Sequence, residues 1–401
     1  MKTIFNKIWM LVLLVGAFTA CEETSTFNQG NGKPAEVTYV RMCDPALSDS
    51  LLSGAYLGTR IAIIGENLAG VQEIWFNDIA AKLNPMYITQ NAIIVDVPSV
   101  IPEAVTNTIR LITADNFETV YPFKTIVPSP ILNKMKCEFV NDGDTAIIYG
   151  NYFLGDETTP LTVSFFGNLA AEVVSYDLTS VSFKVPEGAQ AGEISVTSMY
   201  GTTRSSFKFR DKTGLITDFH SASWGNPWGK GVRAEEDPCD GMYALFYSAE
   251  HSGWNWNEAL MNVYWAPSAN GNVPVAEGDY TTMALRFEIN CITWTDVPLV
   301  IWFDTYGDNI NIDDASKAQC HWKPWLKDGS VSEYKTDGWE TITIPLTEFK
   351  YNKDESLTDK SIGNIENYTN INLFMFGAQT DPANKYPVNF KIDNVRIVPI
   401  N

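Results

Sequence analysis

Tryptophan side chains gather in three short segments of this chain, and their neighbours point to one kind of chemistry. The segments are Ser223-Trp-Gly-Asn-Pro-Trp-Gly229, Gly253-Trp-Asn-Trp-Asn-Glu258 and His321-Trp-Lys-Pro-Trp325. Gly, Pro and Asn favour turns, so these segments are predicted to be loops. An indole plane offers a large apolar area at a small entropic cost. It can stack on the C–H face of a sugar ring while neighbouring polar groups bond the hydroxyls, so the pattern predicts a site for a neutral glycan.

The candidate glycan-binding residues come from these three clusters. Trp254 and Trp256 would project to the same side of an extended chain. A tryptophan in a β-rich module is otherwise a core residue, and four that lie inside strand-like runs are assigned to the core: Trp265, Trp294, Trp302 and Trp339. The residues expected to contact the glycan are Trp322, Trp325, Trp254, Trp256, Trp228, Trp224 and His321.

Catalytic constellations are missing from the same region. A glycoside hydrolase requires two carboxylates that face each other across the scissile bond. Glu250, Glu258 and Glu288 are isolated, and no Glu-x-Asp-x-x-Glu string occurs. The sequence also contains neither a Gly-x-Ser-x-Gly elbow nor a set of metal-ligand histidines. Binding without catalysis is therefore predicted, and a hydrolase is the weaker alternative.

No cofactor is expected. The acidic stretch Asp304-Thr-Tyr-Gly-Asp308, together with Asp313-Asp314, could supply oxygen ligands to a structural calcium ion. Its spacing does not match an EF-hand loop, so a hydrated acidic loop is the preferred interpretation.

The six cysteines show no CxxC spacing, which argues against zinc. Apart from Cys21, buried cysteines acting as small hydrophobes are the preferred interpretation, with at most one disulfide among the last three. These five residues are Cys43, Cys137, Cys239, Cys291 and Cys320.

The N-terminus has the pattern of a secretory signal. Lys2 and Lys7 precede an apolar run from Ile8 to Phe18, which is too short to span a membrane. The run ends in small residues before Cys21, and this ending resembles a bacterial lipobox with Phe18 where Leu is usual. The resemblance implies lipidation of Cys21, and a plain signal peptide with Cys21 merely nearby is the alternative. The acidic residues that follow it resemble the signal that exports Bacteroidota lipoproteins to the outer face of the outer membrane.

Charge narrows the range of partners. The formal charge is -20, and it becomes -22 (26 basic against 48 acidic residues) once Lys2 and Lys7 leave with the signal segment. Such a surface repels phosphate backbones and anionic polymers. Nucleic acid, heparin-like and pectic partners are therefore poor candidates, whereas a neutral polysaccharide or oligosaccharide is unopposed.

An internal repeat organises the first half of the chain. Arg60-Ile-Ala-Ile-Ile-Gly65-Glu-Asn-Leu68 resembles Thr145-Ala-Ile-Ile-Tyr-Gly150-Asn-Tyr-Phe153, and each copy later reaches a strand that ends in Val-Pro. Short β-branched runs between Gly, Asn and Pro turns predict two small β-sandwiches. The motifs resemble the TIG/IPT immunoglobulin-like family, which implies spacer or interaction domains. The single tryptophan in these copies, Trp75, is expected in the core.

The C-terminal module differs in composition, because ten of the twelve tryptophans and all three histidines follow residue 215. Many strand signals in one long unit predict a jelly-roll-like sandwich. Asp337-Gly-Trp-Glu-Thr-Ile-Thr-Ile-Pro-Leu-Thr-Glu-Phe349 and Phe390-Lys-Ile-Asp-Asn-Val-Arg-Ile397 resemble paired strands of carbohydrate-binding sandwiches. The aromatic-Pro-Trp segment resembles part of their ligand platform, and on that ground Trp322 and Trp325 are the preferred contact residues.

The whole chain thus resembles the surface glycan-binding lipoproteins that are encoded beside SusD-like proteins in polysaccharide utilisation loci. The resemblance implies an all-β protein that is anchored to the outer membrane at the cell surface, binds a β-glucan or xyloglucan-type glycan and works with a SusC/SusD-like transporter. A protein-binding adhesin is the alternative. The expected segments are a signal peptide (1–21), a flexible tether (22–35), module 1 (36–127), module 2 (128–211) and the sandwich (215–401).

Overall fold

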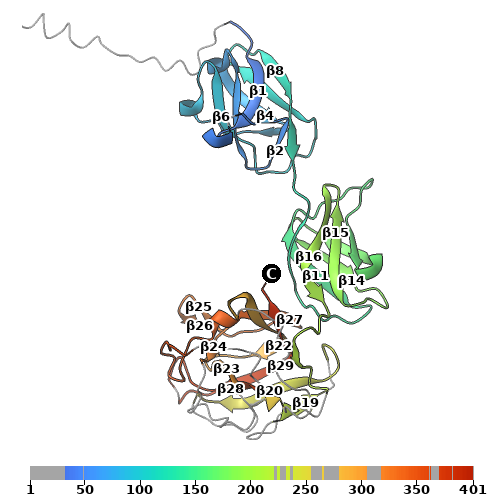
Figure 1. The fold of residues 1–401 in the computed structure, drawn as a ribbon, viewed down its shortest axis with the longest axis vertical. Coiled ribbons are helices and arrows are strands. Elements are labelled where there is room, and N and C mark those ends of the chain that lie inside the picture. Colours follow the sequence, from blue (N-terminus) through green and yellow to red (C-terminus); the bar gives the residue numbers. More distant parts are fainter. Residues whose placement is uncertain are drawn as a thin grey trace, which may run out of the picture. The chain divides into compact units, whose positions relative to one another are not determined.

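A computed structural model gives the fold of the chain (Figure 1). It describes residues 32–47, 49–220, 238–253, 280–304, 318–360, 362, 370–381 and 383–400, and the backbone of 224–225, 232–234 and 264–265. The chain divides into two compact units, Met1–Pro128 and Ser129–Asn401. The second unit contains both module 2 and the sandwich.

Module 1 packs a three-stranded sheet, β1-β3-β6, against a four-stranded sheet, β5-β4-β7-β8, while β2 and β9 pair in parallel. The buried residues between the sheets include Ile61, Ile63, Ile74 and Leu111. The strands are β1 (Glu36–Met42), β2 (Gly54–Tyr56), β3 (Arg60–Glu66), β4 (Val71–Phe76), β5 (Ile79–Ala80), β6 (Ala92–Asp96), β7 (Thr108–Thr113), β8 (Glu118–Pro122) and β9 (Lys124–Ile126). Single 3₁₀ turns are η1 (Pro45–Leu47), η2 (Leu68–Gly70) and η3 (Pro85–Tyr87).

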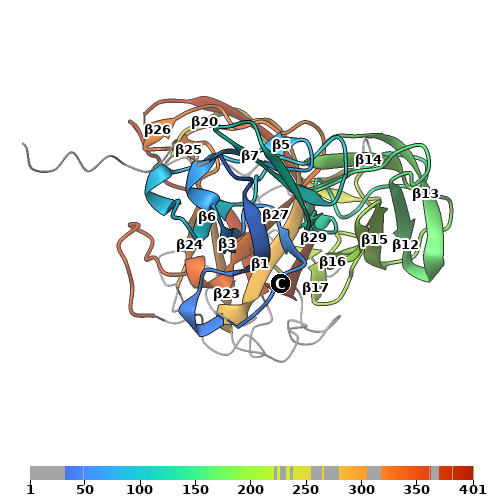
Figure 2. The ribbon, with the colours of Figure 1, turned by 90° about the horizontal axis from the view of Figure 1, so that it is seen from above.

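Module 2 is a seven-stranded arrangement with the order β10-β11-β14-β13-β12-β15-β16, and its green strands are labelled in Figure 2. Its core contains Ile148, Val163, Phe183 and Val196. The elements are β10 (Ile131–Met135), β11 (Thr145–Asn151), β12 (Thr162–Phe165), η4 (Phe166–Asn168), β13 (Leu169–Tyr176), β14 (Ser180–Lys184), β15 (Gly192–Ser198) and β16 (Gly201–Phe209).

The repeated glycines have the same structural cause in the two modules. A Cβ atom at Gly65 would lie 1.8 Å from the carbonyl oxygen of Glu36, and one at Gly150 would lie 1.8 Å from that of Ile131. In both modules the neighbouring strand carries a β-bulge at this point. The bulge brings the backbones so close together that only glycine fits.

The sandwich consists of two facing sheets. The larger follows the order β19-β20-β29-β22-β27, with β17 also pairing with β29, and the smaller follows β24-β23-β28. The strands of the larger sheet are β17 (Leu215–Thr217), β19 (Val232–Ala234), β20 (Tyr243–His251), β22 (Met283–Thr293), β27 (Glu340–Pro345) and β29 (Tyr386–Pro399). The other elements are β18 (Trp224–Gly225), β21 (Tyr264–Trp265), η5 (Tyr280–Thr282), β23 (Leu299–Asp304), β24 (Cys320–Trp322), β25 (Leu326–Lys327), β26 (Ser330–Val331), η7 (Leu346–Glu348) and β28 (Asn370–Met375).

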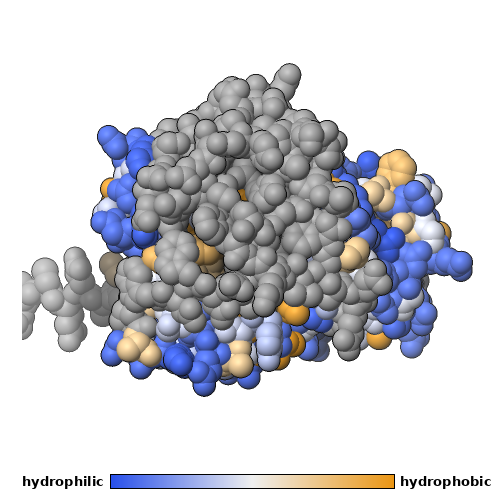
Figure 3. Space-filling model, turned by 90° about the horizontal axis from the view of Figure 1, so that it is seen from below, coloured by the Kyte–Doolittle hydropathy of each residue, from blue (hydrophilic) through white to orange (hydrophobic). Residues whose placement is uncertain are grey.

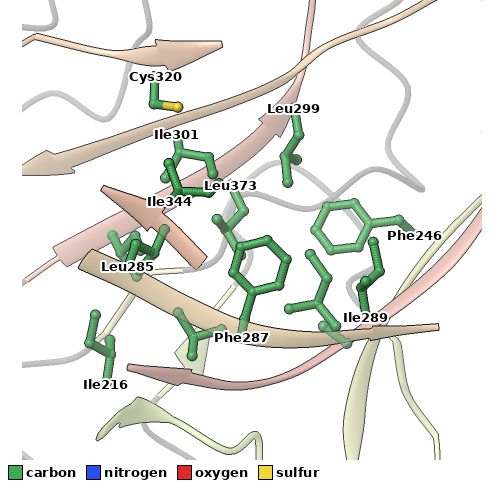
Figure 4. Packing of buried hydrophobic residues seen from close by; sticks show 14 of the residues in the cluster. Ile216, Phe246, Leu285, Phe287, Ile289, Leu299, Ile301, Cys320, Ile344 and Leu373 are labelled. Atoms are coloured by element: carbon green, nitrogen blue, oxygen red, sulfur yellow. The ribbon is translucent and has the colours of Figure 1, made fainter. Parts of the chain in front are cut away.

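Alternation along the strands builds the core between these sheets. Leu285, Phe287 and Ile289 of β22 point towards Ile301 and Leu373 of the facing strands (Figure 4). All five side chains are buried. Each strand of the sandwich therefore has one face in this core and one face outside it.

The prediction of an all-β chain with two immunoglobulin-like sandwiches and a larger C-terminal sandwich is confirmed. Trp75 corrects one detail, because it lies half-buried on the outer face of β4 and not in the core. Its indole N–H donates to Glu73 at 2.8 Å, and the Arg110 guanidinium lies 5.3 Å from its ring. Within the described residues, no helix is long and apolar enough to cross a membrane.

Module 2 packs on the outer face of the larger sheet of the sandwich through a buried ion network. The Arg396 guanidinium donates to Glu288 at 2.7 Å and to Glu138 of module 2 at 2.7 Å. Arg286 donates to the other oxygen of Glu138 at 2.9 Å. Burial raises the pKa of Glu288, and the neighbouring Arg396 opposes that rise. The network joins the two modules, since each supplies charges that the other neutralises.

Candidate functional site

The smaller sheet has a second apolar face, turned away from the main core. Because Leu299, Ile301 and Phe303 face the core, the alternate residues of β23 lie on the opposite side. The residues that make up this outer cluster are Val300, Trp302, Phe374 and Phe376, and their exposed fractions are at most 6%. Trp302 and Phe374 meet edge to face, and Phe374 stacks on Phe376.

Asn372 lies on the same outer face, two residues before Phe374 in the edge strand β28. It is the direct cross-strand partner of Trp302, and it is completely buried. Among the described residues, neither its amide nitrogen nor its amide oxygen has a hydrogen-bond partner. An unpaired buried amide is costly. A ligand hydroxyl, which both donates and accepts, would satisfy the two atoms together.

Polar residues flank the aromatic face on the side of β24. His321 is the cross-strand partner of Val300, so its ring lies on the outer face, where it meets the edge of Tyr351. Lys353 places its ammonium 4.9 Å from the ring of Phe376. These groups give the face both hydrogen-bonding atoms and fixed positive charge.

An ion pair holds this flank in place. Lys323 donates to Glu355 and, at 3.0 Å, to the side-chain oxygen of Gln379. Interaction with His321, whose Nδ1 lies 3.8 Å from Glu355, and with Lys323 lowers the pKa of Glu355 to about 2. Glu355 is therefore ionised at every pH at which the protein would work.

The described parts of the three tryptophan clusters lie in or beside this sheet, although they come from different parts of the chain. Trp224 of the first cluster pairs through its backbone with Trp265 in the β18–β21 ribbon, and β21 runs beside β28. The carbonyl of Gly253, the first residue of the second cluster, accepts from the Gly377 N–H at 2.9 Å, directly after Phe376. His321 of the third cluster lies in β24 at the opposite edge of the sheet.

Most of the first and second clusters lies outside the described residues. The other predicted contact residues Trp228 and Trp256 lie outside the described residues, as does Trp254, and only the backbone of Trp224 is described.

The structure corrects the role predicted for Trp325. Its side chain is fully buried in the main core. A turn closed by the Leu326 N–H and the Lys323 carbonyl directs the indole inwards. There its N–H donates to the Val297 carbonyl at 3.1 Å, and Trp294 donates to the same carbonyl at 2.7 Å. The proline predicts a loop at the surface, but the turn it helps to form directs the Trp325 indole into the protein.

Trp322 packs in the same direction. It pairs with Leu299 in the sheet, so it lies on the core side, where its ring meets the edges of Phe287, Trp294 and Tyr334. It is only partly buried. The third cluster therefore contributes His321 to the outer face, and its two indoles are directed towards the core.

The tryptophans assigned to the core divide into three groups. Trp294 and Trp302 are buried, as predicted, although Trp302 belongs to the second apolar face. Trp339 is half-buried and packs against Cys137, Phe139 and Cys239 where module 2 meets the sandwich. The side chain of Trp265 lies outside the described residues.

Sequence reasoning missed Asn372, Phe374, Phe376 and Tyr351. The signal that could have revealed them is in Asn370-Ile-Asn-Leu-Phe-Met-Phe376, where both alternating sets of positions contain large apolar residues. A strand with two apolar faces is covered on both sides.

The carboxylates that a hydrolase would need are engaged elsewhere. Glu288 is fully buried in the ion network under module 2. Glu250 is exposed and pairs with Lys385 at 3.0 Å. Glu258 and the acidic stretch from 305 to 314 lie outside the described residues, and the described part of the chain contains no cluster of His, Cys, Asp or Glu suited to a metal ion.

Known proteins share this organisation. Residues 209–399 match the surface glycan-binding protein B xyloglucan binding domain. The surface glycan-binding protein PbSGBP-B from Prevotella bryantii is 27% identical, with a TM-score of 0.76 over 92% of this chain and 99% of that chain. An SGBP-B from a complex xyloglucan utilization locus in Bacteroides uniformis, 18% identical, has the same fold with a TM-score of 0.50 over 92% of this chain and all of that one.

A curated relative links the chain to the immunoglobulin-like repeat. It is an IPT/TIG domain-containing protein of Bacteroides ovatus that is 28% identical over 164 residues, which are 38% of this chain. The aligned part is about a third (33%) of the length of that relative.

The fold and these matches support a surface glycan-binding protein. The chain is similar to the SGBP-B proteins, with IPT/TIG-like modules before a C-terminal domain that matches the xyloglucan binding domain model.

Proposed function

We propose that this protein captures a neutral β-glucan or xyloglucan-type polysaccharide at the outer face of the β24-β23-β28 sheet. Trp224, Trp228, Trp254 and Trp256 would provide stacking planes. The side chains of Asn372 and His321 are buried in this structure, so they would bond hydroxyl groups only if the glycan displaces the groups that cover them. The observation that carries the proposal is that the described parts of three sequence-distant clusters lie in or beside one sheet, on whose outer face the Asn372 amide has no partner among the described residues.

The arrangement suits a neutral chain molecule better than a charged one. The overall charge of -20 disfavours polyanions. Each stacking contact would contribute on the order of 1 kcal/mol, so several are needed together. An internal stretch of a long polysaccharide can supply several sugar rings to one face, which a single monosaccharide cannot.

The surrounding machinery belongs to the same proposal. Cys21 would carry lipid and anchor the protein in the outer membrane, and many copies on one surface would add avidity. The captured polysaccharide would then pass to a SusC/SusD-like transporter. The SGBP-B of Bacteroides uniformis, which comes from a xyloglucan utilization locus, supports this choice of glycan and of a transport partner.

Affinity gel electrophoresis with neutral polysaccharides tests the proposal. Xyloglucan, mixed-linkage β-glucan, xylan and mannan would each be cast into a gel. Retardation by xyloglucan or a β-glucan is expected, and the double variant W254A/W256A should lose it. Trp75→Ala is the matched control, because this half-buried tryptophan of module 1 lies in the other unit. Retardation by none of the polysaccharides would instead favour a protein-binding adhesin.

Binding without hydrolysis is the second part of the proposal. The named relatives are glycan-binding proteins, and Glu288 and Glu250 each have cationic partners. After prolonged incubation with the retarding polysaccharide, the number of reducing ends should stay constant. A steady increase that disappears on substitution of Glu258 would assign a hydrolase instead.

A further inference from the structure

Two thiols face each other where module 2 meets the sandwich. The Sγ atoms of Cys137 and Cys239 are 3.8 Å apart. Both side chains are buried, with exposed fractions of 5% and 3%. Both thiols donate to the same acceptor, the Phe139 carbonyl, at 3.0 Å and 3.2 Å. The pair therefore has one residue from each module and a shared orientation.

The separation allows a covalent bond after a small adjustment. A disulfide has an S–S length of about 2.0 Å, so the two sulfur atoms need to approach by a little under 2 Å. Neither cysteine lies in a strand: Cys137 follows β10, and Cys239 precedes β20. Segments outside strands can absorb such a movement without breaking a ladder of backbone hydrogen bonds.

A cleft gives reagents a route to the pair. It has a volume of about 310 Å³ and is lined by residues of both modules, among them Cys137, Cys239, Asn141 and Trp339. The other described cysteines differ: Cys291 and Cys320 lie in the main core of the sandwich, and Cys43 lies in module 1. Only Cys137 and Cys239, of the described cysteines, share a hydrogen-bond acceptor.

We propose that Cys137 and Cys239 form a disulfide that joins module 2 covalently to the sandwich after export. The two thiols lose two protons and two electrons. A disulfide oxidant, small-molecule or protein-borne, takes up both and becomes two thiols, through a mixed disulfide on one cysteine that the other resolves. The cell surface lies outside the reducing cytosol, so the bond can persist there.

The bond would fix a junction that the Arg396 network already closes. Burial raises the pKa of the Cys239 thiol well above its ordinary value, and only a thiolate reacts. The closed junction should therefore oxidise slowly, and oxidation is expected while the modules assemble. Once formed, the bond constrains a loop of about a hundred residues in the unfolded chain, which stabilises the assembled unit.

Oxidative refolding tests the proposal. The purified protein would be unfolded, refolded with oxidised glutathione, digested without reduction and analysed by mass spectrometry. The expected result is the loss of two free thiols and one cross-linked peptide pair containing Cys137 and Cys239. The melting temperature of the second unit should rise by roughly 5–10 °C relative to the reduced protein.

Two variants complete the experiment. C137S/C239S should keep its thiol count unchanged under oxidation and show no oxidation-dependent melting shift, whereas the control C291S should behave like the unsubstituted protein. Mixed disulfides with glutathione alone, a different cysteine pair, or a full set of free thiols in the refolded unsubstituted protein would each overturn the proposal. These readouts do not use glycan binding, so they stay independent of the proposed function.

Discussion

The sandwich has two outer faces, and they are built by opposite means. The face of the larger sheet is charged: Arg396, Glu288 and Arg286 lie buried there and meet Glu138 of module 2. The face of the smaller sheet is aromatic, with Trp302 and Phe374 around an unpaired amide. One face holds charges that another module of the same chain neutralises, and the other holds hydrogen-bonding capacity that no described group uses.

This difference separates structural roles from binding roles. Buried charges in the first face are useful only with their partners, because an unpaired buried charge is strongly unfavourable. An unpaired neutral amide on an aromatic face costs less free energy than an unpaired buried charge. It can therefore stay unpaired until a ligand binds. In the view of Figure 3, the described surface is mostly hydrophilic, with hydrophobic residues in separate spots.

The largest expected loss of stability concerns Trp325. This residue was predicted to contact the glycan, but the structure places it in the core. Trp325→Ala should lower the free energy of unfolding by about 4–5 kcal/mol, because it removes a buried indole and its bond to Val297. Urea unfolding measures this loss. Trp254→Ala should leave stability nearly unchanged and weaken glycan retardation. Equal stability losses in the two variants would contradict the division of roles.

The charged face should be almost as sensitive. Arg396→Met leaves Glu138 and Glu288 buried without their main cation, so the free energy of unfolding should fall by about 3–4 kcal/mol. Lys385→Ala removes a cation from an exposed pair with Glu250, whose side chains are 60% and 69% exposed, and should cost less than about 0.5 kcal/mol. If the two variants were equally stable, the network would not hold the junction.

A pH effect is expected from His251, the last residue of β20. It is fully buried, and neither ring nitrogen has a hydrogen-bond partner in the described part of the chain; burial lowers its pKa from 6.5 to about 4. The unfolded chain therefore binds more protons between these values, so stability should fall by up to about 3 kcal/mol as the pH drops from 6.5 to 4. Above pH 6.5 the contribution of His251 to the free energy of unfolding should be constant.

His251→Leu should remove this loss of stability at low pH, as denaturant unfolding at several pH values would show.

A second group, Asp393, has the opposite effect on stability. Burial raises the pKa of Asp393 from 3.8 to about 8, so its contribution to stability decreases as the pH rises from about 4 to 8. The contribution of His251 is the difference between the stability–pH profiles of the unsubstituted protein and His251→Leu. The contribution of Asp393 is obtained in the same way with Asp393→Asn. A profile unchanged by His251→Leu would assign the acid sensitivity to other groups.

The smallest effect separates the two faces most directly. Asn372→Leu removes two unpaired polar atoms, so stability should rise by about 1 kcal/mol. Glycan affinity should fall roughly 5- to 10-fold if the amide bonds a hydroxyl. The control is Asn389→Leu, on β29 of the larger sheet, which should leave affinity unchanged. Melting curves and gel retardation give the two readouts, and unchanged affinity in Asn372→Leu would remove this residue from the proposed site.

The local patterns of the sequence were sufficient for the architecture. Gly65 and Gly150 marked the repeat because a bulge admits no side chain at these positions. Short β-branched runs between turns predicted strands, and the expectation that Trp294 lies in the core is confirmed. The concentration of tryptophan after residue 215 identified the module that matches the xyloglucan binding domain model. These features depend on near neighbours in the chain, which a single sequence displays.

Only the tertiary structure decided which way individual side chains point. His321, Trp322 and Trp325 are almost adjacent in sequence, but the first lies on the outer face and the indoles of the other two are directed towards the core. Cys239 matters because Cys137, far along the chain, lies beside it. Asn372 matters because no described residue bonds its buried amide. Strand pairing fixes a side chain to one face or the other, and that pairing joins residues whose separation leaves no local signal.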